Sequence, residues 1–147
     1  MGTNTKPASV KHVIQIESWN FDYLFGVDDR KIVSGLPYWE SRRIQVRGKI
    51  LKPALKASAA RISLSSSDGL VSRELKSTES GKPIGYISYR AADYSANLFM
   101  PSDAFGLVLQ AFAANRYHWI SMDGAKSGNG EVMVHTFMLL ESIDETD

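Results

Sequence analysis

The sequence predicts a mainly β domain, either an antiparallel β-sandwich or a strongly curved sheet of about seven or eight strands, with one α-helix near residues 102–115. Three observations support this prediction. Short runs rich in β-branched and aromatic residues recur along the chain. Gly, Pro, Ser and Asp separate these runs. Only the segment after Pro101 repeats its apolar residues at helical spacing. The alternative is an α+β fold with the helix on an antiparallel sheet.

The first strand is predicted over residues 13–25. Its early part places Ile14 and Ile16 on one face, whereas its later part places Trp19, Phe21, Tyr23 and Phe25 on the opposite parity. Because side chains alternate between the two faces of a strand, a change of parity indicates a bulge or bend, here near Ser18.

The segment 43–51 has the clearest amphipathic strand pattern. One face carries Ile44, Val46, Gly48 and Ile50, and the other carries Arg43, Gln45, Arg47 and Lys49. This alternation predicts a strand with its apolar face inward. Pro53 either ends the strand or places it near a sheet edge.

Further strands are predicted over 60–65, 84–90 and 94–100, the last two joined at residues 91–93. The polar segment 66–81 is interpreted as a loop with a short strand at 70–75. A final hairpin is expected from 117–122 and 131–140, around a glycine-rich loop at 123–130.

In the predicted helix, Ser102 or Asp103 is expected to cap the first turn, and Asn115 to end the last one. The apolar stripe is interpreted as Ala104, Leu107, Val108 and Ala111, widened by Phe105, Leu109 and Phe112. Leu107 and Val108 are therefore expected in the core.

The length of 147 residues fits one domain, expected over 11–141, with a flexible tail at 1–10 and an acidic tail at 142–147. The absence of cysteine excludes disulfides and thiolate metal sites. No signal peptide or membrane-length apolar run is visible in the sequence, so a cytoplasmic protein without membrane contact is expected.

Catalytic and cofactor signatures are weak in this sequence. Lys126 and Ser127 lie among glycines, but strand residues follow them, where a phosphate-binding loop requires a helix. His118 and His135 would come close together on the final hairpin, although no third metal ligand has a fixed spacing to them. We therefore expect no cofactor and no metal, and favour a non-enzymatic role.

The strongest recognition candidate is the segment around Tyr38 and Trp39, followed by Arg42, Arg43, Arg47 and Lys49. Tyr and Trp offer large rigid contact area, and arginine offers a planar fork of donors. These residues predict a binding or adaptor domain that contacts a protein partner or a second copy of itself.

The charge distribution keeps a second hypothesis open. Between Ser41 and Ser67 there are seven basic residues and no acidic one, although the net charge is only +1. Such a basic strand could follow the phosphates of a nucleic acid, which is the alternative function. The acidic segment 131–147 could instead neutralise it. The third hypothesis is a sugar or small-ligand site with Trp19, Tyr38 or Trp39 as the stacking platform.

Overall fold

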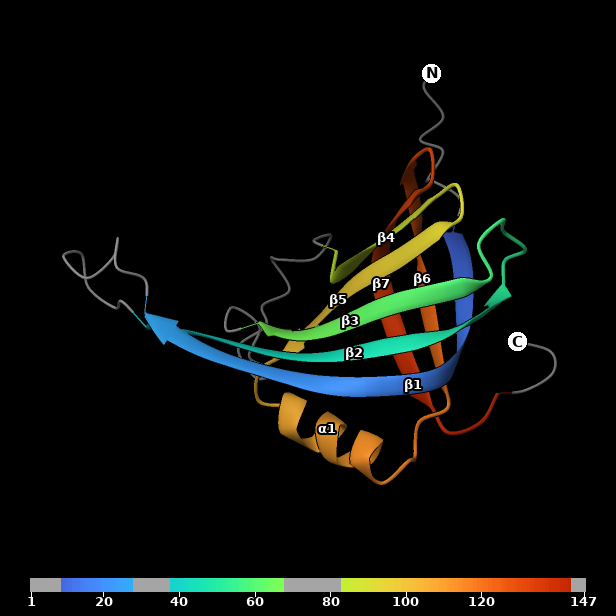
Figure 1. Ribbon diagram of the computed structural model, residues 1–147. Coiled ribbons are helices and arrows are strands. Elements are labelled where there is room, and N and C mark those ends of the chain that lie inside the picture. Colours follow the sequence, from blue (N-terminus) through green and yellow to red (C-terminus); the bar gives the residue numbers. More distant parts are fainter. Residues whose placement is uncertain (1–8, 28–37, 68–82, 144–147) are drawn as a thin grey trace, which may run out of the picture.

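The structure is a computed structural model that describes residues 9–27, 38–67 and 83–143, with backbone only at residues 38 and 39. These ranges contain seven strands and one helix (Figure 1). In chain order they are β1 (Ser9–Val27), β2 (Tyr38–Lys52), β3 (Ala59–Ser67), β4 (Gly85–Arg90), β5 (Asp93–Pro101), α1 (Phe105–Ala113), β6 (Trp119–Gly128) and β7 (Glu131–Leu140). The strand expected at 70–75 lies outside the described residues.

The strands close into a barrel in the order β1-β2-β3-β5-β4-β7-β6, with β6 pairing back onto β1. The expectation of a mainly β fold with a strongly curved sheet and one helix is confirmed. The sheet is not purely antiparallel, because β3 and β5 pair in parallel. In the sheet, the β4–β5 hairpin lies between β3 and β7 with β5 beside β3, so the chain crosses from β3 to β4 and returns along β5 in the direction of β3.

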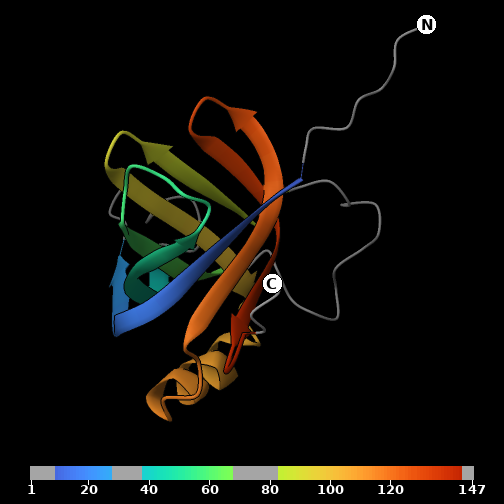
Figure 2. The ribbon, with the colours of Figure 1, turned by 90° about the vertical axis from the view of Figure 1, so that its right-hand side faces the viewer.

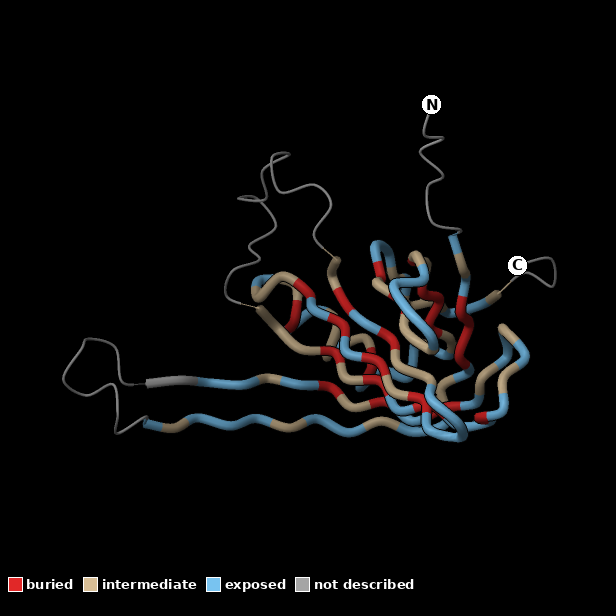
Figure 3. The backbone as a smooth tube through the Cα atoms, turned by 90° about the horizontal axis from the view of Figure 1, so that it is seen from above, coloured by how far each residue is buried: buried red, intermediate tan, exposed pale blue. Residues whose placement is uncertain are grey.

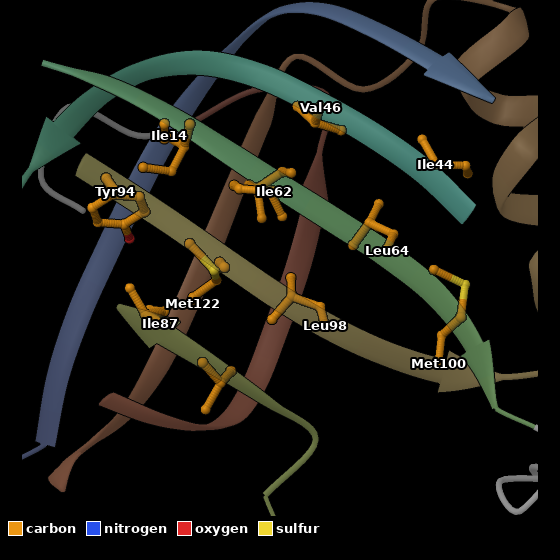
Figure 4. Close-up of a cluster of buried hydrophobic side chains, with 14 of the residues drawn as sticks. Ile14, Ile44, Val46, Ile62, Leu64, Ile87, Tyr94, Leu98, Met100 and Met122 are labelled. Carbon is orange, nitrogen blue, oxygen red and sulfur yellow. The ribbon is translucent and has the colours of Figure 1, made fainter. Parts of the chain in front are cut away.

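Side chains from all around the barrel meet in its interior (Figure 4). The buried set includes Ile14, Ile44, Val46, Ile62, Leu64, Ile87, Tyr94, Leu98, Met100 and Met122. The alternation predicted for β2 is confirmed, because Ile44, Val46 and Gly48 are buried while Arg47 and Lys49 are exposed. The predicted bulge in β1 is also confirmed, since the β1–β2 register shifts between Ile16 and Ser18.

Helix α1 lies across one end of the barrel (Figures 1 and 2). It buries Phe105 and Phe112, and the Phe112 ring centroid lies 5.5 Å from that of Trp19 on β1. The expectation that Leu107 is in the core is wrong, because its side chain is 72 % exposed. Phe105 and Phe112 are buried, and Val108 and Leu109 are half-buried against the core, so four residues of the predicted stripe face inward. The stripe is centred on the two large aromatic rings and not on Leu107.

The ends of α1 agree only in part with the prediction. Asn115 adopts a positive φ of 54° just after the helix, as expected for its end. At the start, the expectation that Ser102 or Asp103 is the cap residue is wrong, because the N-cap is Ala104, which has no side-chain capping hydrogen bond. No helix in the described ranges is long and apolar enough to cross a membrane.

The final hairpin is longer and tighter than predicted. Strand β6 continues through Gly128, and the turn is made at Asn129 and Gly130, where Gly130 has a φ of 74°. The glycine-rich segment is therefore mostly strand, which leaves no loop of the kind that holds phosphate.

Candidate functional site

A two-stranded ribbon projects from the barrel. Strand β6 pairs with β1 only over Ser9–Gln15, and β3 pairs with β2 only over Arg43–Lys49. Beyond these pairings, Tyr23–Val27 of β1 and Tyr38–Arg42 of β2 pair only with each other within the described residues. We call these two segments the ribbon tip. It extends well past the barrel and past α1 (Figures 1 and 3).

The ribbon tip exposes large apolar side chains. Tyr23, Leu24, Phe25 and Val27 are 55 %, 52 %, 60 % and 48 % exposed, and Phe21 at the base is 39 % exposed. The segment Tyr23–Val27 carries no charged residue. A contiguous group of exposed apolar residues of this kind is typical of an interaction surface.

The base of the ribbon is fixed against α1. The ring centroids of Phe21 and Phe105 lie 5.9 Å apart, and the Arg42 guanidinium carbon lies 5.5 Å from the centroid of the Phe105 ring. Phe105 is itself only 1 % exposed, so it is a rigid support. The direction in which the ribbon leaves the barrel is therefore set by packing at its base.

Polar contacts order the inward-turned face of the ribbon. The Tyr23 hydroxyl donates a hydrogen bond of 2.9 Å to Glu40, and Arg42 Nε lies 3.4 Å from the same carboxylate, an ion pair without hydrogen-bond geometry. The hydrogen bond to Glu40 raises the pKa of Tyr23, and partial desolvation adds to it. These contacts hold the Tyr23 ring in place across the two strands.

The other face of the ribbon carries a second cross-strand contact. Asp22 accepts a hydrogen bond of 2.9 Å from Gln45, and Arg43 Nη2 lies 3.5 Å from the same carboxylate. Each face of the ribbon is therefore ordered by side-chain contacts between β1 and β2.

The structure places the predicted site residues in two regions. Tyr38 and Trp39 lie in the ribbon tip, opposite Val27 and Gly26, and their side chains lie outside the described part of the structure. Arg42 is half-buried at the end of the ribbon tip nearest the barrel. The other three predicted residues, Arg43, Arg47 and Lys49, follow β2 onto the outer wall of the barrel.

Sequence analysis missed the exposed residues on β1. The alternation of Phe21, Tyr23 and Phe25 predicts that they share one face of a strand, but it gives no sign of their exposure. The length of the strand was a signal of their exposure. A 19-residue strand is longer than the wall of a small barrel, so part of it must project beyond the neighbouring strands. The structure shows that the last five residues of β1 have no barrel strand beside them except β2.

The outer wall of the barrel carries the predicted basic row. Arg47 of β2 lies directly opposite Arg61 of β3, and Arg61 pairs with Asp93 at 2.8 Å. None of the ion pairs within the described ranges involves Arg47 or Lys49. The row therefore keeps part of its positive charge.

The acidic segment does not neutralise this row where the structure describes it. Glu131 pairs with Arg90 at 2.8 Å, and Glu141 pairs with Arg116 at 2.6 Å. The reason is topological, because β7 lies between β4 and β6 and is not a neighbour of β2.

His118 and His135 do not come together. The His118 amide bonds to the Leu140 carbonyl, so His118 lies beside the end of β7, five residues beyond His135. At about 3.3 Å per residue this separates them by roughly 17 Å along the strand. No group of three potential metal ligands occurs in the described ranges.

His12 is the one buried histidine among the described residues. Its Nδ1 lies 2.8 Å from the Tyr94 hydroxyl, and its ring packs against Tyr89 and Tyr94. Burial, together with a smaller effect of the nearby Lys126 charge, lowers the pKa of His12 to about 4. Burial also raises the pKa of Tyr94. Both groups are therefore neutral near pH 7 and satisfy each other's hydrogen bond, which is a structural role.

Trp19 is half-buried, and its ring packs against Phe112. The ribbon tip remains the most exposed apolar surface of the described chain. Comparison with known proteins adds no relative: no protein-family model, curated protein or solved structure matches this chain.

Proposed function

We propose that this protein is a non-enzymatic binding domain that associates with a second copy of itself through the edge of β1 that faces away from β2 in the ribbon tip. The observation that carries the proposal is that Tyr23–Val27 has a β-strand partner on one side only, within the described residues, while its large side chains are about half exposed.

The edge of β1 that faces away from β2 supplies the backbone hydrogen bonds of this contact. A strand paired on one side leaves alternate backbone N–H and C=O groups without a strand partner, and such an edge is a template for another strand. A two-stranded ribbon is marginal in water, so a further strand would stabilise it.

The side chains supply the apolar part of the contact. In an antiparallel pairing of two copies centred on Phe25, Tyr23 of one copy lies opposite Val27 of the other. Because side chains of equal parity share a face, Tyr23, Phe25 and Val27 of both copies come to lie on the same face of a four-stranded sheet. No charge lies in this segment, so the pairing of identical strands brings no like charges together.

Sedimentation equilibrium over a range of protein concentrations tests this proposal. We expect a monomer–dimer equilibrium that the double substitution Phe25→Lys/Val27→Lys abolishes, because lysine on an edge strand blocks strand addition. The matched control is Leu51→Lys, at an exposed position near the other end of β2.

Hydrogen exchange locates the contact. Amides of residues 23–27 should become more protected as concentration rises in the wild-type protein, and not in the double variant. A wild-type chain that stays monomeric at all concentrations, or a dimer that Leu51→Lys disrupts and Phe25→Lys/Val27→Lys does not, would show the proposal to be wrong.

A second candidate function is binding to nucleic acid through the basic row. The observation that favours it is the exposed group of Arg43, Arg47 and Lys49 on β2, with Arg61 beside Arg47 on β3. Exposed strand residues two apart lie roughly 6.5–7 Å from each other, a spacing at which a row of cations can follow a phosphate backbone.

A further inference from the structure

The outer face of the barrel, where β1, β6 and β7 adjoin, contains a small pocket near the opposite end of β1 from the ribbon tip. Val13 lies opposite Ser121, and Ser121 lies opposite Met138 in the strand registers. These residues have the opposite parity to the core residues Ile14 and Ile120, so they point away from the barrel interior.

Despite pointing outward, two of these side chains are buried. Val13 is 4 % exposed and Ser121 is 1 % exposed. The chain after β7 accounts for this burial, because Ser142 and Ile143 line the same pocket on the outer surface. The pocket has a volume of about 200 Å³ and is partly open to solvent.

Ser121 is the feature that points to a ligand. Its Oγ is buried, and it has no hydrogen-bond partner among the described residues. A buried hydroxyl without a partner costs about 1–3 kcal/mol, so native proteins rarely keep one without a reason. Ser121 lines the pocket, so a ligand oxygen placed beside it there could accept a hydrogen bond from this hydroxyl.

The rest of the lining defines the ligand's chemistry. Lys11 stands at the pocket on the same face of β1 as Val13, and no ion pair within the described segments involves it. Leu140, Met138 and Ile143 provide apolar walls. One cation and one unpartnered hydroxyl beside apolar walls fit a carboxylate with an apolar tail.

Asp123 places a negative charge beside Lys11, which weakens the attraction of the pocket for a carboxylate and makes that attraction depend on Lys11. Asp123 lies opposite Lys11 in the β1–β6 register, two residues along β6 from Ser121. With Lys11 present, an entering carboxylate meets a cation; with Lys11 removed, it meets the field of Asp123 alone.

We propose that this pocket binds a short aliphatic monocarboxylate, with Lys11 and Ser121 holding the carboxylate and Met138, Leu140 and Ile143 enclosing the tail. The size is consistent, because an apolar cavity of about 150 Å³ accommodates benzene. Hexanoate is slightly larger than benzene, and this pocket is larger than that cavity, so hexanoate is the probe of choice.

Titration of the isotope-labelled protein with hexanoate tests the site, with hexanol as the matched neutral probe. Hexanoate should shift the Met138 methyl and the Ser121 amide resonances in a saturable way, and hexanol should bind more weakly. Lys11→Met should weaken hexanoate binding by about threefold or more, as for a partly exposed ion pair, and change hexanol binding little.

Ser121→Ala separates binding from folding. It should weaken hexanoate binding and also raise the midpoint of thermal unfolding of the free protein, because it removes the unpartnered hydroxyl. The proposal is overturned by hexanoate shifts that do not saturate or that miss these strands. It is also overturned by equal affinity for hexanol, or by hexanoate affinity that Lys11→Met leaves unchanged.

Discussion

His12 on β1 and Tyr94 on β5 share a hydrogen bond of 2.8 Å between Nδ1 and the hydroxyl oxygen, although the two strands are not neighbours in the barrel. The bond therefore spans the barrel interior, where His12 and Tyr94 are each only 1 % exposed. It ties strands on opposite sides of the barrel, and it places a titratable group in the core.

The burial of His12 makes the stability of the folded protein depend on pH. Burial lowers the pKa of His12 from 6.5 to about 4. Above pH 6.5 the imidazole is neutral in both states and contributes no pH dependence. Between pH 6.5 and 4 the unfolded chain binds a proton that the folded protein does not, so stability falls as the pH falls. The loss should approach about 3 kcal/mol near pH 4.

Denaturant unfolding at a series of pH values, on wild type and His12→Gln, measures this effect. The variant should be less stable at pH 7.5, and should lose less stability between pH 7 and pH 4.5 than the wild type. His135→Gln, at an exposed position, is the control and should follow the wild-type curve. Parallel curves for wild type and His12→Gln would contradict the assignment.

The burial pattern of α1 predicts very different losses of stability for two truncations in the same helix. Phe112→Ala should lower the free energy of unfolding by about 3–5 kcal/mol, because the ring is buried between Trp19 and Tyr117. Leu107→Ala should change it by less than about 0.5 kcal/mol, since this side chain is mostly exposed. Equilibrium unfolding in urea compares the two, and similar losses would show that the helix is rotated about its axis.

Substitution by alanine should raise the stability of the protein at one glycine and lower it at another. A Cβ at Gly106 in α1 would meet nothing within 4 Å, so Gly106→Ala should stabilise the protein by about 0.5–1 kcal/mol. At Gly48 the added Cβ would overlap the Gln15 carbonyl oxygen and lie 2.8 Å from the Ile14 side chain. Gly48→Ala should therefore destabilise by about 1–3 kcal/mol or more, since β1 must move away from β2. Thermal unfolding of both variants in one buffer gives the comparison.

The basic row predicts a salt-dependent affinity if nucleic acid is a ligand. Titration with a single-stranded oligonucleotide at two salt concentrations should then show affinity falling as salt rises. Arg43→Ala/Arg47→Ala/Lys49→Ala should weaken binding to all sequences and reduce the salt slope. Absence of binding at low salt would eliminate this candidate and leave the ribbon-tip proposal unaffected.

The sequence was a good guide wherever one rule decided the structure. The alternation around Val46 predicted the inner and outer faces of β2, and the parity change in β1 predicted the register shift after Ile16. Asn115 was recognised as the residue that ends α1, because few side chains adopt a positive φ. In each case local stereochemistry and burial favour the same conformation.

The sequence was a poor guide wherever two patterns competed or a distant pairing decided. In α1 the stripes through Leu107 and through Phe105 and Phe112 fit the same helix, and only the packed barrel end selects the aromatic one. The separation of His118 from His135 depends on how far β6 continues before its turn. The exposure of Tyr23 depends on where β6 and β3 stop pairing, which no local pattern encodes.

Closure of the barrel also has a kinetic consequence. The pairing that closes it joins β1 near the start of the chain to β6, where Ser9 lies opposite Ala125. Pairing of β1 with β2 requires a much shorter loop, so the entropy of loop closure favours its formation first. The inner face of β1 then remains open until the whole intervening chain has folded, and folding should be correspondingly slow for a domain of this size.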